Sequence, residues 1–308
     1  MLVLGYFTGS DASRASALSA PVNVVSMDVI TVAADGNLSG SLPTDLLASL
    51  SAMGKVSYAC ISNFGVTDFD PAIAHGAIVT NRARTIANIV ALSKTPHLEG
   101  INLDFEGLYV NDRDAYSSFV ADLATQLHGS GTKLILSIPA KSVDDPSNDW
   151  SWPYDYAALG KSADFLQVMT YDEHVPSQPA GPVAGIDWMQ ASLKFAASQV
   201  SPSKLLSGLP AYGYVWNLTR GGGDTVAWKD FQSYVAATGQ ISQWDPTSQS
   251  AWVKYTGTDG SQLQMWFETP MGIQAKVSVV QRMNLAGLSV WALGMEDSAF
   301  WNAVRAGK

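Results

Sequence analysis

Residues 99–106, Glu-Gly-Ile-Asn-Leu-Asp-Phe-Glu, alternate polar and apolar side chains with a strict period of two. That period predicts a β-strand with Asn102, Asp104 and Glu106 on one face and the apolar side chains on the other. Polar side chains turned into a buried sheet are costly unless they are hydrogen-bonded, so we interpret these three as functional. The alternative is a strand of an antiparallel sheet whose polar face is solvated.

The rest of the chain alternates strands and helices around this stretch. Helical periodicity lies between several strand-like segments, as in residues 116–127, which end near Gly129. Parallel strands that alternate with helices predict an α/β fold, and eight such units predict a closed (β/α)₈ TIM barrel. A doubly wound open sheet is the alternative. The eight predicted strands are Leu2–Phe7, Val22–Thr31, Lys55–Ser62, Gly100–Glu106, Lys133–Ala140, Phe165–Asp172, Lys204–Tyr212 and Ala286–Leu293.

The interval between the seventh and eighth predicted strands is too long for one connection. It spans roughly 70 residues, whereas about 30 suffice for a βαβ unit. It contains a helical stretch and two strand-like segments, Trp252–Thr256 and Gln262–Phe267, joined across Thr-Asp-Gly at residues 258–260. We therefore expect one domain over residues 1–308 with a small α+β insertion at residues 217–268.

Composition narrows the classes of partner. The net charge is −9 without a Lys/Arg cluster, so a polyanion would be repelled and we expect no nucleic-acid partner. Cys60 is the only cysteine, and the four histidines lack paired spacing, so we expect no metal and no cofactor. No apolar run approaches the length of a membrane span, so we expect no membrane partner.

The carboxylate strand resembles that of glycoside hydrolase family 18, whose fourth barrel strand carries DGxDxDxE with the last Glu as general acid. Gly100, Asp104 and Glu106 agree with that pattern, Glu99 stands for the first Asp, and Asn102 replaces the middle one. The joint order of several motifs along nearly the whole chain makes chance agreement improbable. The other motifs are Gly-Tyr-Phe at 5–7, Gln-Val-Met-Thr-Tyr-Asp at 167–172, Gly-Leu-Pro-Ala-Tyr-Gly-Tyr at 208–214, and Trp291.

Within that family, the chain is similar to the branch that includes spore-cortex-lytic N-acetylglucosaminidases. The similarity rests on Asn102 and on residues 169–174, 181–184 and 266–268. One departure from typical chitinases lies at the end of the third predicted strand, where Ser-Asn-Phe at residues 62–64 replaces their SxGG. The floor of the sugar site is therefore expected to differ.

The resemblance implies a retaining reaction in which the substrate supplies the nucleophile. Glu106 would protonate the glycosidic oxygen, the C2 acetamido oxygen would attack C1, and Asp104 would stabilise the oxazolinium ion. This scheme departs from the usual pair of catalytic carboxylates. Tyr171 would bind the acetamido group, and Asp172 would bind the same sugar.

The resemblance also implies the remaining substrate contacts, at Tyr6, Asn102, Met169 and Trp291. Trp291 would form the floor of the cleavage site, whereas core packing is the alternative for a lone Trp on a strand. The Asn102 amide is expected to donate a hydrogen bond to Asp104, which would then stay ionised to lower pH than beside a carboxylate. Candidates for further subsites, among which the sequence does not choose, are Trp150, Trp152, Trp216, Trp244, Trp252 and Trp266.

The function expected from these residues is hydrolysis of β-1,4 linkages next to N-acetylglucosamine in chitin or chitin-like glycans. The alternatives are a peptidoglycan N-acetylglucosaminidase of cortex or cell wall, a non-catalytic lectin on the same fold, and a barrel glycosidase with a direct carboxylate nucleophile. The lectin would typically lack the acid that Glu106 provides. We expect a monomer with a polysaccharide substrate, secreted or in the cell envelope, whose signal segment is not present in this sequence.

Overall fold

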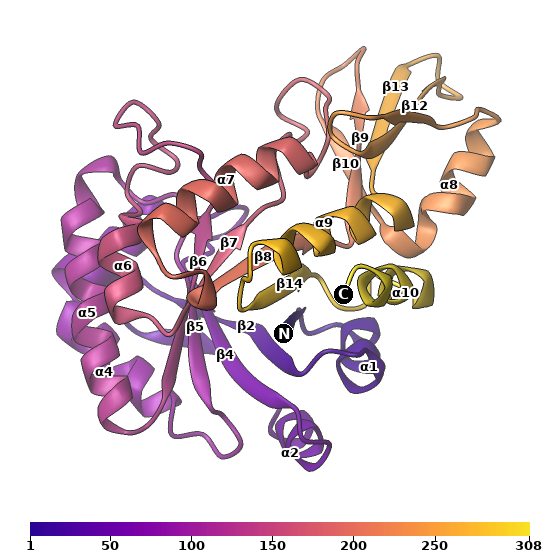
Figure 1. The fold of residues 1–308 in the computed structure, drawn as a ribbon. Coiled ribbons are helices and arrows are strands. Elements are labelled where there is room, and N and C mark those ends of the chain that lie inside the picture. Colours follow the sequence, from indigo (N-terminus) through magenta and orange to yellow (C-terminus); the bar gives the residue numbers. More distant parts are fainter.

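A closed barrel of eight parallel strands forms the centre of the computed structural model, which describes residues 1–308 (Figure 1). The strand order is β1-β14-β8-β7-β6-β5-β4-β2, and pairing of β1 with β2 closes the barrel. The predicted (β/α)₈ fold is confirmed, and each predicted strand coincides with a barrel strand. The barrel strands are β1 (Leu2–Phe7), β2 (Val24–Val32), β4 (Val56–Ser62), β5 (Gly100–Asp104), β6 (Lys133–Pro139), β7 (Phe165–Met169), β8 (Leu205–Pro210) and β14 (Gly287–Trp291). A short strand, β3 (Leu38–Gly40), pairs antiparallel with β2.

Helices surround the barrel because each buries an apolar stripe against the strands. In α5, Tyr116, Phe119 and Leu123 are fully buried at helical spacing. Side chains that precede the helices satisfy free N–H groups, as Asp155 does for Ala158 at the start of α6. None of the helices has the length and apolar character that a membrane crossing requires. The helices are α1 (Asp11–Ser19), α2 (Thr44–Ala52), α3 (Pro71–His75), α4 (Arg82–Leu92), α5 (Arg113–Gly129), α6 (Tyr156–Ser162), α7 (Ile186–Gln199), α8 (Phe231–Thr238), α9 (Pro270–Arg282) and α10 (Ser298–Ala306).

A second, antiparallel sheet is inserted between β8 and β14, which confirms the α+β insertion of the predicted fold. Its order is β10-β9-β13-β12-β11, and α8 accompanies it at one end of the molecule (Figure 1). A fully buried ion pair between Glu268 and Lys276, with 2.7 Å between Oε2 and Nζ, joins the end of β13 to α9. The division into a domain at 1–308 and a subdomain at 217–268 remains a prediction. The strands are β9 (Tyr212–Asn217), β10 (Gly223–Ala227), β11 (Gln243–Asp245), β12 (Ser250–Thr256) and β13 (Gln262–Phe267).

Side chains inside the barrel form layers, as alternate residues of each strand point inward. An apolar layer nearer the amino ends of the strands contains Leu4, Val24, Tyr58, Ile135 and Leu206. Two residues further along, the layer is polar, and a continuous series of side-chain hydrogen bonds crosses the barrel. Its members are Ser26, Asn102, Ser137, Tyr6, Gln167 and Ser289, each bonded to the next over 2.9–3.3 Å.

Candidate active site

A cavity of about 760 Å³ opens above this polar layer, at the carboxyl ends of the barrel strands. That end is where (β/α)₈ enzymes carry their active sites. Asn102 lies in the layer beneath the cavity rather than in its lining. The other predicted site residues line the cavity together: Tyr6, Asp104, Glu106, Met169, Tyr171, Asp172 and Trp291.

Glu106 follows β5, and its backbone is held by Asn63 from the end of β4. The Glu106 N–H donates to Asn63 Oδ1 over 2.7 Å, and Asn63 Nδ2 donates to the Glu106 carbonyl over 2.8 Å. Asn63 is fully buried and also donates to the carbonyl of Asp70 over 3.0 Å. Sequence reasoning missed this role. The only signal was that Ser-Asn-Phe at residues 62–64 departs from the family pattern.

The surroundings of Glu106 favour its protonated form. Burial raises the pKa of this carboxyl well above its usual range, and the charges of Asp104 and Asp172 raise it further. No Lys, Arg or His lines the cavity to oppose this effect. The shift therefore favours the protonated form of Glu106, which is the form that a general acid needs.

Asp104 stands one strand step below Glu106 and is 5% exposed. Burial is the largest cause that raises its pKa to about 7, the charge of Asp28 adds to this, and the Ser137 hydroxyl partly lowers it. Its Oδ1 atom is buried without a hydrogen-bond partner. Asp104 therefore changes protonation state near neutrality.

The expectation for Asn102 is wrong. Asn102 Nδ2 donates to Ser137 Oγ over 3.0 Å rather than to Asp104, and Asn102 Oδ1 accepts from Ser26 Oγ over 3.0 Å. Burial and the charge of Asp28 nevertheless raise the pKa of Asp104 to about 7, and the comparison with a carboxylate at position 102 remains a prediction. The alternation of polar and apolar residues placed Asn102 on the correct face of the strand. It did not reveal which residues of other strands would be its hydrogen-bond partners.

Tyr171 and Asp172 follow β7 and close another side of the cavity. Asp172 has a left-handed backbone, with φ of 60°. Its Oδ1 accepts hydrogen bonds from Tyr212 and Tyr214 over 2.6 and 2.7 Å. Burial raises the pKa of Asp172, and both tyrosine hydroxyls oppose the rise. A Cβ at Gly208 would come within 2.5 Å of the Tyr171 ring, so only glycine leaves room for that ring.

Aromatic side chains form one wall of the cavity. The Trp291 ring packs against Tyr6, with 5.1 Å between ring centroids, and also against Met169 and Tyr171. An indole exposed in this way offers a flat apolar surface to a sugar ring. The peptide bond between Trp291 and Ala292 is cis.

Of the six tryptophans left open by the sequence, only Trp150 lines the cavity, and Trp188 joins it. Trp150 lies beside Gly107, the residue after Glu106. A Cβ atom placed on Gly107 would be 3.7 Å from the Trp150 ring. Trp216 does not line the cavity, but its indole N–H donates to the backbone carbonyls of Val175 and Gln178, which do. Trp252 and Trp266 pack on each other in the second sheet, with 6.1 Å between centroids.

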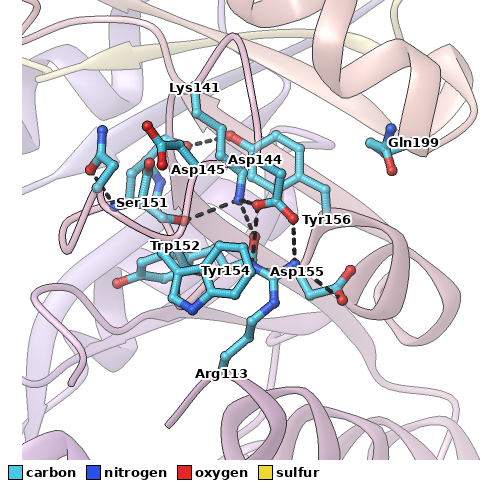
Figure 2. A network of polar contacts seen from close by, with 12 residues as sticks. Arg113, Lys141, Asp144, Asp145, Ser151, Trp152, Tyr154, Asp155, Tyr156 and Gln199 are labelled. Carbon is cyan, nitrogen blue, oxygen red and sulfur yellow. Dashed lines mark hydrogen bonds and ion pairs between the residues drawn. The ribbon is translucent and has the colours of Figure 1, made fainter. Parts of the chain in front are cut away.

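The loop that carries Trp150 is tied down by a polar network (Figure 2). Lys141, only 5% exposed, donates to Asp144 over 2.7 Å and to the carbonyls of Ser151 and Tyr154 over 3.0 and 2.6 Å. Arg113 of α5 pairs with Asp144 over 2.6 Å, and its guanidinium lies 4.1 Å from the centroid of the Trp152 ring. This network fixes the loop against α5 and so sets the position of the cavity wall.

No group of three or more His, Cys, Asp or Glu side chains gathers as a metal-ion site would require. The absence of a metal and of a cofactor remains a prediction. The chemistry available in the cavity is that of carboxyl groups with unequal proton affinity and of tyrosine hydroxyls.

A carboxyl with a raised pKa, a second carboxyl one strand step below it and an aromatic wall at the mouth of a (β/α)₈ barrel are the features of a glycosidase. A model of glycosyl hydrolases family 18 matches residues 61–296. The chain belongs to this family, so the resemblance noted in the sequence is confirmed.

Relatives and solved structures agree with this assignment. The uncharacterized glycosylase YvbX of Bacillus subtilis is 34% identical over 99% of this chain and 91% of its own. The cortical fragment-lytic enzyme of Bacillus subtilis is 29% identical over 72% of this chain but only 52% of its own. The crystal structure of a chitinase from Chromobacterium violaceum has 37% identity and a TM-score of 0.95, and the match covers 99% of this chain and 98% of that one.

Proposed function

We propose that this glycosidase hydrolyses β-1,4 linkages next to N-acetylglucosamine in chitin or chitin-like glycans, with retention of the anomeric configuration. The observation that carries the proposal is the pairing of a buried Glu106, whose surroundings raise its pKa, with Asp104 at the base of the cavity. We further propose a single catalytic domain that acts as a monomer, outside the cell or in its envelope.

In the proposed reaction Glu106 gives its proton to the glycosidic oxygen as the C1–O bond breaks. The acetamido oxygen of the same sugar attacks C1 and forms an oxazolinium ion, whose positive charge Asp104 stabilises as an anion. Tyr171 donates a hydrogen bond to the acetamido group and Asp172 binds the same sugar. Water then attacks C1, and the Glu106 carboxylate takes its proton, which restores the starting state.

The other contacts are assigned by position. Trp291 forms the floor under the sugar at the cleavage point, and Tyr6 and Met169 support its ring. Asn102 acts from the layer below, where its bond to Ser137 fixes the base of the cavity. It does so without lining the cavity itself.

The charges around the cavity favour a neutral glycan. Asp68 and Glu173 line it together with the three acids already described, and no cation does. Peptidoglycan carries free carboxylates on the peptides attached to its muramic acid residues, and these would be repelled there. The names of the cortical fragment-lytic relatives support the alternative, cleavage of peptidoglycan. The retained Glu106 speaks against a lectin, which needs no acid.

Product analysis on chitin oligosaccharides and on purified peptidoglycan, side by side, tests the substrate. We expect cleavage of the chitin oligosaccharides to dominate, and the reverse would establish the alternative. Substrates deacetylated at the cleavage-site sugar should lose kcat, and NMR should find the β-anomer as the first product. An α-anomer, or comparable activity on plain glucans, would exclude substrate assistance.

A further inference from the structure

Asp28 on β2 has no role in the reaction described so far, yet it belongs to the same interior layer as Asp104. Asp28 lies two residues beyond Ser26, as Asp104 lies two residues beyond Asn102, and Ser26 and Asn102 are hydrogen-bonded over 3.0 Å. On two parallel strands the same step of two residues preserves that neighbourhood. Asp28 and Asp104 therefore face each other one layer above the Ser26–Asn102 contact.

The strand register supports this placement. Ser26 is in register, through Tyr58 of β4, with Gly100 of β5. Its hydroxyl nevertheless reaches Asn102, two residues further along, as the tilt of barrel strands requires. Asp28 is in register, through Cys60, with Asn102. The same offset brings its side chain to Asp104. The irregularity of β2 begins only after Asp28, so it does not disturb this register.

No positively charged side chain lies near Asp28 or Asp104 to offset their charges. The groups that face Asp28 are the Cys60 thiol of β4, the Tyr6 hydroxyl of β1, Asp104 and, more distantly, Glu106. None of them is positively charged, and neither aspartate forms a salt bridge. Burial raises the pKa of Asp28 to about 6, which its Cys60 neighbour partly lowers, and the charge of Asp28 adds to the rise of the pKa of Asp104 to about 7.

We propose that Asp28 is a positioning residue that shares one proton with Asp104 across the barrel interior. Asp28, on β2, would supply the carboxyl partner of Asp104. Residue 102 of β5 does not supply one, because it is an asparagine. The partnerless Oδ1 of Asp104 fits this arrangement, since an oxygen that faces another carboxyl group meets no N–H or hydroxyl donor. Two buried carboxyl groups of which one raises the pKa of the other titrate as a coupled pair, because both cannot cheaply ionise together.

The pair has a function in the reaction, so this inference rests on the proposed substrate-assisted mechanism. In the resting cavity the proton holds Asp104 neutral beside Glu106. As positive charge develops on the oxazolinium ion, the proton passes from the Asp104 carboxyl to the Asp28 carboxylate. Asp104 becomes the anion that stabilises the ion, and Asp28 becomes neutral. The total charge of the pair does not change.

Two substitutions with opposite expected shifts test the pair. Asp28→Asn removes the charge that raises the pKa of Asp104, so the acidic limb of kcat/KM should move down by about one pH unit. Asn102→Asp adds a carboxyl on the same strand and should move that limb up. The double variant should return toward the wild type. Asp114→Asn, an equal charge change on the surface of α5, should leave the profile unchanged.

A titration without substrate separates this inference from the proposed function. The wild type is labelled with ¹³C at the aspartate carboxyl carbons, and the Asp104 signal is identified by its loss in Asp104→Asn. We expect that signal to titrate near pH 7 in the wild type and lower in Asp28→Asn.

An Asp104 signal that titrates near its ordinary value in the wild type would overturn the pair, even if Asp28→Asn does not fold. Superimposable acidic limbs of Asp28→Asn and wild type would overturn it as well. If the protein proves inactive on N-acetylglucosamine polymers, the proposed function fails, but the titration still decides the pair.

Discussion

Asn63 holds Glu106 by both groups of its backbone: it accepts from the Glu106 N–H over 2.7 Å and donates to the Glu106 carbonyl over 2.8 Å. The residue lies at the end of β4, and its side chain spans to the segment after β5. A carboxyl whose backbone is fixed on both sides points into the cavity at a defined height. Small displacements of a catalytic group are costly to catalysis, so we expect this contact to affect the rate as well as the stability of the fold.

The first prediction concerns this contact. Asn63→Ala should lower kcat by about 10- to 100-fold, because Glu106 loses the side chain that fixes its position. The matched control is Asn88→Ala, which removes a partly buried hydrogen bond to the Gly36 carbonyl far from the cavity. Both variants should lower the unfolding temperature. Steady-state kinetics well below that temperature check the difference, and an equal kcat in the two variants would show that Asn63 is only structural.

The second prediction concerns stability and pH. The pKa of Asp104 is raised by burial from 3.8 to about 7 in the folded chain, so between those values the folded state holds a proton that the unfolded state has lost. The unfolding free energy should therefore fall as pH rises through this window, and Asp28 contributes in the same direction.

Asp104→Asn removes this titration and should stabilise the protein near neutral pH by on the order of 1–3 kcal/mol, at the expense of activity. Urea unfolding at about pH 4.5 and about pH 7.5 measures the slope for wild type and variant. Asp114→Asn serves as the surface control and should keep the wild-type slope. An unchanged slope in Asp104→Asn would mean that Asp104 is ionised throughout this range.

The third prediction concerns the loop wall. Lys141→Met leaves the carbonyls of Ser151 and Tyr154 without their donor and loosens the loop that carries Trp150. KM for long oligosaccharides should rise about tenfold with kcat little changed, since uniform binding is lost rather than transition-state stabilisation. Lys161→Met, on the exposed side of α6, is the control. A fall in kcat without a change in KM would instead mean that the polar network around Lys141 supports the chemical step rather than substrate binding.

The fold followed from local sequence pattern because each barrel strand is a short apolar run and several of the helices show a helical period. The period of residues 99–106 also placed Asp104 and Glu106 correctly on one face. The contacts that the sequence did not predict join strands far apart in the chain. Asn102 meets Ser26 and Ser137, and such pairs depend on strand tilt and register, which no local pattern encodes.

The tryptophans show the same limit. Trp150 and Trp252 are equivalent as sequence signals, yet one lines the cavity and the other packs in the second sheet. Trp188, in α7, lines the cavity although it was not among the tryptophans that the sequence singled out. Which aromatic residue reaches the substrate depends on how loops and helices lie over the barrel mouth.

The central claim is that Glu106 donates the proton to the leaving group. We would measure kcat/KM of Glu106→Gln on two N-acetylglucosamine oligomers, one with a sugar leaving group and one with a dinitrophenolate, which leaves without a proton. The amide cannot donate, so cleavage of the sugar leaving group should fall by about 10²–10⁴-fold while the dinitrophenyl substrate is cleaved at a rate much nearer the wild type. Equal losses on both substrates, or near-normal cleavage of both by the folded variant, would contradict the assignment of Glu106 as the acid.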